Sequence, residues 1–194
     1  MKKSIVLIVA LAVSLFIFFT IYFFTLATHQ KHLPVFDEVA PFTLIDTNTK
    51  EFGLNELKGK TWVIGFFFTT CGDDCPMMTK HMAALHRSYR LMDEVALVSV
   101  TVNPENDSPK VLSQYAQKYN ADTSHWHFLT GSRKAITDLV VKSFKVGSIE
   151  EPIFHSTKFV LVDRQGRMRG YYDGTSQKEI EQLFKDMATA VREK

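Results

Sequence analysis

The chain has 194 residues, which suits a single domain of ordinary size preceded by a short separate segment. Its formal net charge of +2 is small, and no run of lysine and arginine is long enough to follow a phosphate backbone, which argues against nucleic-acid binding. Hydrophobic residues make up 45% of the chain, but many of them gather near the N-terminus, so the average combines two segments of different character.

The first predicted element is a membrane anchor at residues 4–27, a range that contains no charged residue. As a helix it would be about 36 Å long, against a hydrocarbon core of roughly 30 Å. A cleavable signal peptide has a shorter apolar region and a small-x-small cleavage site, and Leu26-Ala27-Thr28 is a poor one. We therefore expect an uncleaved, single-pass transmembrane helix.

The charges around this segment predict its orientation. Lys2 and Lys3 favour a cytoplasmic N-terminus, although Lys31 on the other flank weakens the inference. The chain would then sit in the inner (cytoplasmic) membrane, with residues 28–194 facing the periplasm or the cell exterior. Such a compartment tolerates disulfides.

Residues 28–40 are predicted to be a linker of polar to mixed composition, and residues 41–194 a single domain without internal repeats. Apolar runs and turn residues divide this domain into strands that alternate with helices until a hairpin closes the chain. The order predicts an α/β fold of the thioredoxin type, with a mixed central sheet and helices on both faces. The expected strands are residues 42–46, 62–68, 95–102, 126–129, 157–162 and 167–172, and the expected helices are 54–57, 76–92, 108–119, 132–144 and 176–191.

The chain contains a single pair of cysteines, Cys71 and Cys75, at the junction between a predicted central strand and a helix. Backbone N–H groups at a helix start stabilise negative charge, and thiols there have a lowered pKa and are reactive. At this spacing the two Cα atoms would lie about 6 Å apart, which allows either a disulfide or two thiolates on one soft metal ion. A purely stabilising disulfide is a poorer explanation, because so short a loop constrains the unfolded chain little.

A copper site made of two thiolates usually recruits a third ligand, and imidazole suits copper. Among the histidines, His155 has the best position, because it lies in the loop before the strand 157–162. In a thioredoxin topology that loop approaches the cysteines, although on spacing alone a structural role is the commoner one. Auxiliary ligands are possible in principle at His125, His127 and the methionines Met77, Met78 and Met82, for which surface or core roles are more usual.

Four segments in order resemble the Sco/SenC family of copper-binding proteins. The first is Thr69–Pro76, which resembles the family's T-x-C-x-x-x-C-P motif. The second is Val98–Pro104 with Asp107–Pro109, which resembles the family's S-V-D-P-x-x-D-T-P stretch. The third is Trp126–Gly131, which resembles W-x-x-L-T-G. The fourth is His155-Ser156 with the later turn Asp163–Gly166, which resembles the family's D-H-S segment and the turn that follows it.

The resemblance implies that Cys71, Cys75 and His155 bind one copper ion. It also implies a metallochaperone rather than an enzyme, which delivers copper to the CuA site of a haem–copper oxidase, cytochrome c oxidase. The partner would be the oxidase subunit that carries this site, with other copper chaperones or thiol reductants as further partners. Three residues depart from the family pattern and bear on affinity and redox potential more than on ligand identity: Gly72 for proline, and Asn103 and Phe154 for aspartates.

Two other functions would use the same cysteines. A membrane-anchored thiol–disulfide oxidoreductase that keeps partner cysteines reduced needs no His155. A typical thioredoxin has a cis-proline before the strand that faces the cysteines, and Pro152 lies three residues before His155. A peroxidase of the peroxiredoxin type would use a threonine and an arginine beside its cysteine. Thr69 and Thr70 are near, but the sequence identifies no arginine.

Overall fold

The computed structural model describes residues 11–23, 32–147 and 156–193, and the chain divides into two units at His32/Leu33. In the first unit, residues 11–23 form a helix whose side chains are all exposed. No helix within the described ranges is long and apolar enough to cross a membrane. The predicted anchor at residues 4–27 extends beyond the described helix at both ends, so it stays a prediction.

The second unit is built on a mixed sheet of eight strands among the described residues, in the order β1-β8-β7-β4-β5-β6-β2-β3. β4 runs parallel to β5, and β5 parallel to β6, whereas the remaining neighbours pair antiparallel. The strands are β1 (Asp37–Glu38), β2 (Thr43–Asp46), β3 (Glu51–Gly53), β4 (Thr61–Phe67), β5 (Val95–Thr101), β6 (Trp126–Thr130), β7 (Lys158–Val162) and β8 (Arg167–Asp173).

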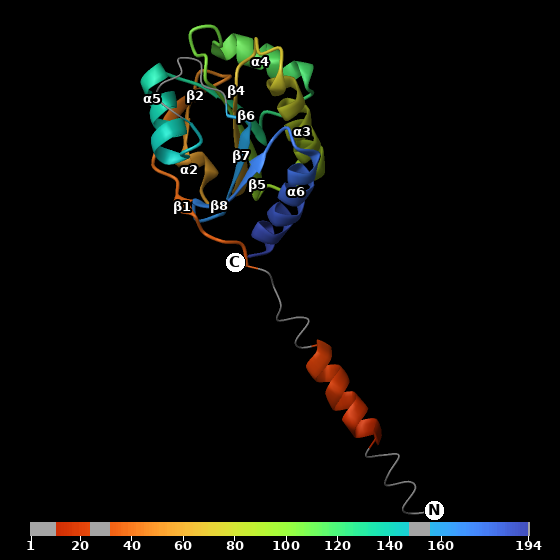
Figure 1. The fold of residues 1–194 in the computed structure, drawn as a ribbon. Helices are drawn as coiled ribbons and strands as arrows, with labels where there is room; N and C mark the ends of the chain where they lie inside the picture. The colour runs from red at the N-terminus through yellow and green to blue at the C-terminus, as the bar shows by residue number, and fades with distance from the viewer. Residues whose placement is uncertain (1–10, 24–31, 148–155, 194) are drawn as a thin grey trace, which may run out of the picture. The chain divides into compact units, whose positions relative to one another are not determined.

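Helices cover both faces of the sheet, as Figure 1 shows. The helices are α2 (Leu54–Leu57), α3 (Asp74–Tyr89), α4 (Pro109–Lys118), α5 (Arg133–Thr137), its π-helical continuation η1 (Asp138–Ser143), and α6 (Gln177–Arg192). Buried side chains of α3, α4 and α6 form one core cluster with one face of the sheet, and those of α2, α5 and η1 form a second cluster with the other face. The predicted mixed sheet with helices on both faces is therefore confirmed.

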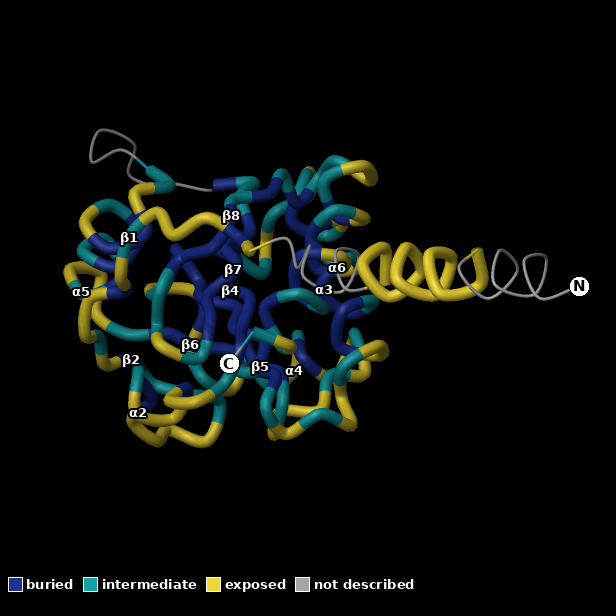
Figure 2. The backbone as a smooth tube through the Cα atoms, turned by 90° about the horizontal axis from the view of Figure 1, so that it is seen from below, coloured by how far each residue is buried: buried dark blue, intermediate teal, exposed yellow. Residues whose placement is uncertain are grey.

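β4 lies at the centre of this arrangement, and all seven of its residues are buried, as the dark centre of Figure 2 shows. Alternation along the strand sends Val63 into one core cluster and Ile64 into the other. Gly65 is required at its position, because a Cβ there would come within 2.7 Å of the Phe159 ring on β7. The continuous apolar run therefore corresponds to a strand covered on both faces.

The structure differs from the sequence prediction at the margins of the domain. Residues 33–40, placed by the sequence in the linker, lie against the domain: Leu33 is buried, and β1 pairs with β8. α3 begins at Asp74 rather than Pro76, so Cys75 lies in its first turn. Pro76 is still tolerated, because the first N–H groups of a helix have no partner within it. The predicted helix 132–144 ends in π-helical geometry.

A buried ion network fixes the beginning and the end of the described domain to the β7–β8 turn. Arg169 donates to the Asp163 carboxylate at 2.8 Å, to the Leu33 carbonyl at 2.6 Å and to the Pro34 carbonyl at 2.9 Å. It also pairs with Glu193 at 2.5 Å, which accepts in turn from the Leu33 N–H. Burial raises the pKa of the Asp163 carboxyl, but hydrogen bonds from Arg167 and Arg169 outweigh it and hold that pKa below its ordinary value.

We expect Arg169→Met to lower the free energy of unfolding by about 3 kcal/mol, because it removes the buried guanidinium that pairs with buried Asp163 and partly buried Glu193. The matched control is Lys134→Met, which removes an exposed pair with Asp138 and should cost less than about 0.5 kcal/mol. Urea unfolding curves of the two variants measure both changes. Equal losses in the two variants would show that the buried network adds nothing specific.

Candidate metal centre

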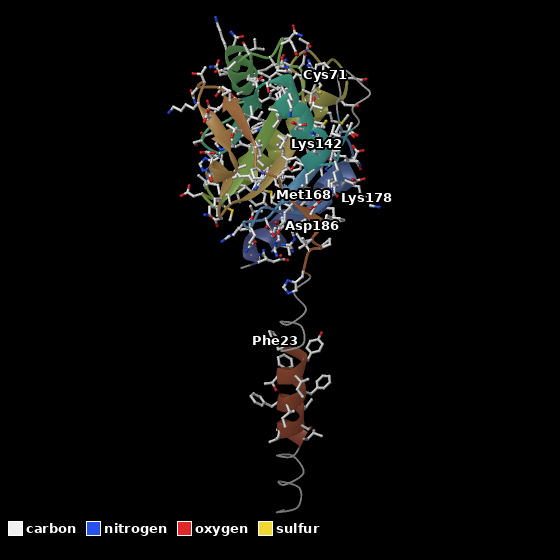
Figure 3. The ribbon with its side chains drawn as sticks, turned by 90° about the vertical axis from the view of Figure 1, so that its left-hand side faces the viewer. Phe23, Cys71, Lys142, Met168, Lys178 and Asp186 are labelled. Carbon is white, nitrogen blue, oxygen red and sulfur yellow. The ribbon has the colours of Figure 1, made fainter. Side chains whose placement is uncertain are left out.

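The cysteine loop leaves the sheet at the carboxyl end of β4. Val102 N–H donates to the Phe67 carbonyl at 2.8 Å, which continues the β4–β5 pairing up to the last residue of β4. The chain then turns, and Cys71 N–H donates to the Phe68 carbonyl at 3.2 Å. Figure 3 shows Cys71 at one end of the domain and Asp186 near the other end. The sequence prediction of a cysteine pair at a strand-to-helix junction is thus confirmed.

The two thiols differ in their exposure. Cys75 is buried with 1% of its surface exposed, whereas Cys71 is only partly buried, and both are free. Burial raises the pKa of the Cys75 thiol to about 12. Contact with Cys71 and the charge of Asp74 add to the rise, and a hydrogen bond from the Phe68 backbone offsets part of it. The expectation that the helix start lowers the pKa is therefore wrong for Cys75, because desolvation outweighs the helix N–H groups.

The first turn of α3 is also connected to a neighbouring helix by hydrogen bonds. The Thr79 hydroxyl donates to the Cys75 carbonyl at 2.7 Å, and it lies 2.8 Å from the Tyr115 hydroxyl on α4. Gly72, by contrast, has open space where a Cβ would stand. Packing therefore does not require glycine at this position, where the family pattern has proline.

A buried carboxylate fixes the loop that precedes Cys71. Asp107 is fully buried at the carboxyl end of β5, and it accepts hydrogen bonds from the Thr69 N–H at 3.0 Å and from the Thr69 hydroxyl at 2.5 Å. The Thr101 hydroxyl at the end of β5 donates to the same carboxylate at 2.5 Å. The backbone two residues before Cys71 is thereby joined to β5. The Thr69 hydroxyl donates to Asp107 and not to a cysteine, so it does not support the alternative function as a peroxidase.

Asn103, one of the departures from the family pattern, has a structural role in the same loop. Its carbonyl accepts from the Asp107 N–H at 3.0 Å, and its side-chain oxygen accepts from the Asn106 amide at 3.1 Å. Its own N–H donates to the Thr101 hydroxyl at 3.0 Å. Asn103 therefore helps to hold Asp107 in place, a role that the sequence pattern alone did not indicate.

The third predicted ligand, His155, lies outside the described residues, as do Phe154 and Pro152. Ser156 is the first described residue after this gap, and it is buried. β7 pairs antiparallel with β4, with Gly65 opposite Phe159, so β7 begins at the edge of the sheet where β4 ends. Ser156 therefore lies at the same edge of the sheet as the cysteine loop.

The surroundings of the other candidate ligands do not support a role in metal binding. Met78 and Met82 are buried in the core cluster that includes Cys75, which supports a packing role, whereas Met77 is exposed. The His127 ring lies against the Phe52 ring, tilted by 40°, and burial lowers the pKa of His127 to about 4. His125 precedes β6 at the opposite edge of the sheet, beside Asp93 and Asp122. Within the described part of the chain, no group of three or more histidine, cysteine and acidic side chains is arranged to hold a metal ion.

The donor set of the described site is thus two free thiols four residues apart, one partly accessible and one buried. Thiolates are the ligands that soft copper(I) prefers. The same pair also fits a dithiol that is oxidised to a disulfide. The residues present therefore fit copper as a bound ion, and they also fit redox chemistry.

Comparison with known proteins identifies the family to which the chain is similar. The model of the SCO1/SenC family matches residues 30–192. The SCO1 protein homolog of Bacillus subtilis (strain 168) is 34% identical over 163 residues, which cover 81% of this chain and 84% of that protein.

Two solved structures add to this likeness. BsSco, described as a member of the Sco family of cytochrome c oxidase assembly proteins with a disulfide switch, is 33% identical with a TM-score of 0.72. The match covers 84% of this chain and all of that one. Bradyrhizobium japonicum ScoI with copper bound is 25% identical with a TM-score of 0.65, over 79% of this chain and 99% of that one.

We expect Asp107→Ala to lower the free energy of unfolding by about 2–3 kcal/mol, because it leaves the donors of buried Thr101 and partly buried Thr69 without their acceptor. It should also increase the rate at which a thiol reagent modifies Cys71, since the loop loses its connection to β5. Chemical unfolding and thiol-modification kinetics measure the two effects. Asp73→Ala, an exposed acid in the same loop, is the control and should change unfolding by less than about 0.5 kcal/mol. If the rate of Cys71 modification were unchanged in Asp107→Ala, the proposed role of this carboxylate in holding the loop would be contradicted.

Proposed function

Because the chain belongs to the SCO1/SenC family, we propose that it is a copper metallochaperone which binds one copper ion through Cys71, Cys75 and His155. The observation that carries the proposal is the pair of free cysteines, four residues apart, at the edge of the sheet where β7 begins. Two thiolates supply soft ligands, and the residue that precedes Ser156 is the proposed imidazole donor. The copper-bound ScoI relative supports copper as the metal.

The unequal exposure of the thiols supports a separate role for each of them in copper loading and release. Cys71 is accessible and would meet an incoming ion or a partner's thiol first, whereas the buried Cys75 would hold the ion until the exchange is complete. Both thiols must lose their protons on binding, so copper loading releases protons and weakens at acidic pH. Transfer would then proceed by stepwise ligand exchange, with the partner's ligands replacing those of this protein.

The proposed recipient is the subunit of a haem–copper oxidase that carries the CuA site. The relative BsSco is described as belonging to a family of cytochrome c oxidase assembly proteins, which supports this choice. We further propose that residues 4–27 anchor the protein in the cytoplasmic membrane and that the domain faces the periplasm or the cell exterior. This location would place the copper site on the side where disulfides are tolerated.

Copper titration of the reduced protein, followed by absorption spectroscopy, tests this function. We expect one copper ion per wild-type chain, loss of the sulfur-to-copper absorption in Cys71→Ser, and an affinity roughly tenfold lower or worse in His155→Ala. His125→Ala is the matched control, because His125 lies at the opposite edge of the sheet and should not affect binding. If Cys71→Ser still bound one ion with unchanged affinity, the assignment would fail.

A second candidate function, thiol–disulfide exchange, is favoured by the same pair of free cysteines, one partly accessible and one buried. The Cys71 thiolate would attack a partner's disulfide and form a mixed disulfide, and the Cys75 thiolate would then attack Cys71 and release the reduced partner thiols. The protein pair would be oxidised to a disulfide, and two electrons would pass to the partner. The disulfide switch described for BsSco supports this redox chemistry.

The two functions separate at His155. We expect His155→Ala to keep full activity towards a model disulfide if exchange is an independent function, because imidazole takes no part in it, while copper binding is weakened. Cys71→Ser should abolish both. A disulfide reductase assay alongside copper titration makes the comparison. Failure of the wild-type protein to reduce the model disulfide would leave copper binding as the function of the pair.

A further inference from the structure

The helix that carries Cys75 begins without a side-chain cap. α3 starts at Asp74, and the side chain of Asp73, at its N-cap position, makes no hydrogen bond to the described backbone of the helix. The first N–H groups of a helix have no partners within it, so an uncapped start opens more readily than the rest of the helix. Cys75 lies in this first turn, and yet only 1% of its surface is exposed. Contacts from outside the helix must therefore keep the turn closed.

A pair of hydroxyl groups supplies such a contact. The Thr79 hydroxyl donates to the Cys75 carbonyl at 2.7 Å, and it lies 2.8 Å from the Tyr115 hydroxyl on α4. A hydroxyl has one proton, and Thr79 gives its proton to the carbonyl, so Tyr115 is the donor in the second bond. Burial is the main reason that the pKa of Tyr115 lies above its ordinary value, so this donor keeps its proton at neutral pH. A chain of two hydrogen bonds therefore runs from α4 to the backbone of Cys75.

The Tyr115 ring is held in place by the aromatic part of the core. Its centroid lies 5.1 Å from that of Phe67 and 6.3 Å from that of Phe128, which it meets edge to face. Phe67 is the last residue of β4, the strand from which the cysteine loop leaves the sheet. The ring also packs against the core cluster that contains Cys75. The position of the hydroxyl is thus set by rings on the central strands, and not by the helix that it holds.

The segment that runs from β5 into α4 holds the cysteine pair from both sides. Asp107, which precedes α4, is hydrogen-bonded to the loop before Cys71. Tyr115 on α4 is connected to the helical turn that contains Cys75. The two attachments differ in their effect, because Cys71 stays partly accessible whereas Cys75 is buried. The attachment through Tyr115 therefore acts on the thiol that reaches solvent only when the start of α3 opens.

We propose that Tyr115 is a positioning residue that keeps Cys75 buried through Thr79, so that ligand exchange begins at Cys71. The inference rests on the proposed function, in which both thiols bind copper and release it in sequence. The Tyr115 hydroxyl is not a ligand and acts on the backbone of Cys75. Without this hydroxyl the first turn of α3 opens more often, and the buried thiol becomes accessible before the other has been exchanged. Copper then leaves from either thiol and at a higher rate.

The rate at which a thiol reagent modifies Cys75 at one fixed pH measures this opening directly. The full-length variants all carry Cys71→Ser, so that Cys75 is the only thiol left of the two in the chain. We expect Tyr115→Phe to raise the rate roughly fivefold, which is the change that the loss of one hydrogen bond makes in an opening equilibrium. Thr79→Val should raise it at least as much, whereas Thr79→Ser keeps the hydroxyl and should leave the rate near its starting value.

The rate of copper release measures the consequence for function. Full-length proteins that retain both cysteines are reduced and loaded with one equivalent of copper(I), and an excess of bathocuproine disulfonate, a copper(I) chelator, then removes the ion. We expect release to be roughly fivefold faster in Tyr115→Phe than in wild type. Tyr115→Phe should add nothing in a Thr79→Val background, because the chain of hydrogen bonds is already broken there.

Tyr89→Phe is the matched control, because it also removes a tyrosine hydroxyl that holds α3. The Tyr89 hydroxyl donates to the Phe184 carbonyl at 3.2 Å, and Tyr89 is the last residue of α3, whereas Cys75 lies in the first turn. This variant should lower stability to a similar degree without changing either rate. Thermal unfolding of the copper-free proteins is recorded for all variants. If Tyr115→Phe does not fold, the comparison of Thr79→Val with Thr79→Ser carries the test.

The outcomes separate the inference from the function on which it rests. Equal rates of Cys75 modification in Tyr115→Phe and Tyr89→Phe would overturn the positioning role, whatever the copper result. Faster modification with an unchanged rate of copper release would overturn the role in exchange and leave the copper function intact. If the wild-type protein bound no copper, the proposed function would fail, and the role in copper exchange would fail with it. Faster modification and faster release in Tyr115→Phe, both absent from Tyr89→Phe, are the result that the inference requires.

Discussion

The pairing of β4 with β5 on one side and β7 on the other is the constraint on which the rest of the domain depends. β4 is covered on both faces, so its register is fixed by packing as well as by hydrogen bonds. Parallel pairing brings the loops after β4 and β5 to one edge of the sheet, and antiparallel pairing brings the start of β7 to the same edge. The two thiols, the Asp107 carboxylate and the segment after His155 meet there for that reason.

A buried carboxylate stabilises the sheet at each end of its strands, but the two carboxylates do so in different ways. At the cysteine edge, Asp107 accepts neutral hydrogen bonds from two threonines and connects successive loops. At the opposite edge, Asp163 pairs with buried Arg169, which also holds the first residues of the domain and the end of α6. The start of the domain is thus fixed at the end of the sheet opposite the thiols.

The central elements could be predicted from sequence because their signals are local. The apolar run 62–68 corresponds to β4, and the cysteine pair follows it as expected. β1 and β3 have only two and three residues, too few to show an alternating pattern. The bond between Asp107 and Thr69 spans 38 residues, and that between His81 and Gly174 spans 93, so no local pattern reveals either. The high pKa of Cys75 was missed because it depends on burial in the fold.

The central claim is that copper is held by both thiolates and by an imidazole from the segment before β7. X-ray absorption of the copper-loaded, full-length protein measures the ligand set directly. The account predicts two sulfur ligands and one nitrogen ligand, with the nitrogen lost in His155→Ala and both sulfurs retained. A site with fewer than two sulfurs, or a nitrogen ligand that persists in His155→Ala, would contradict it.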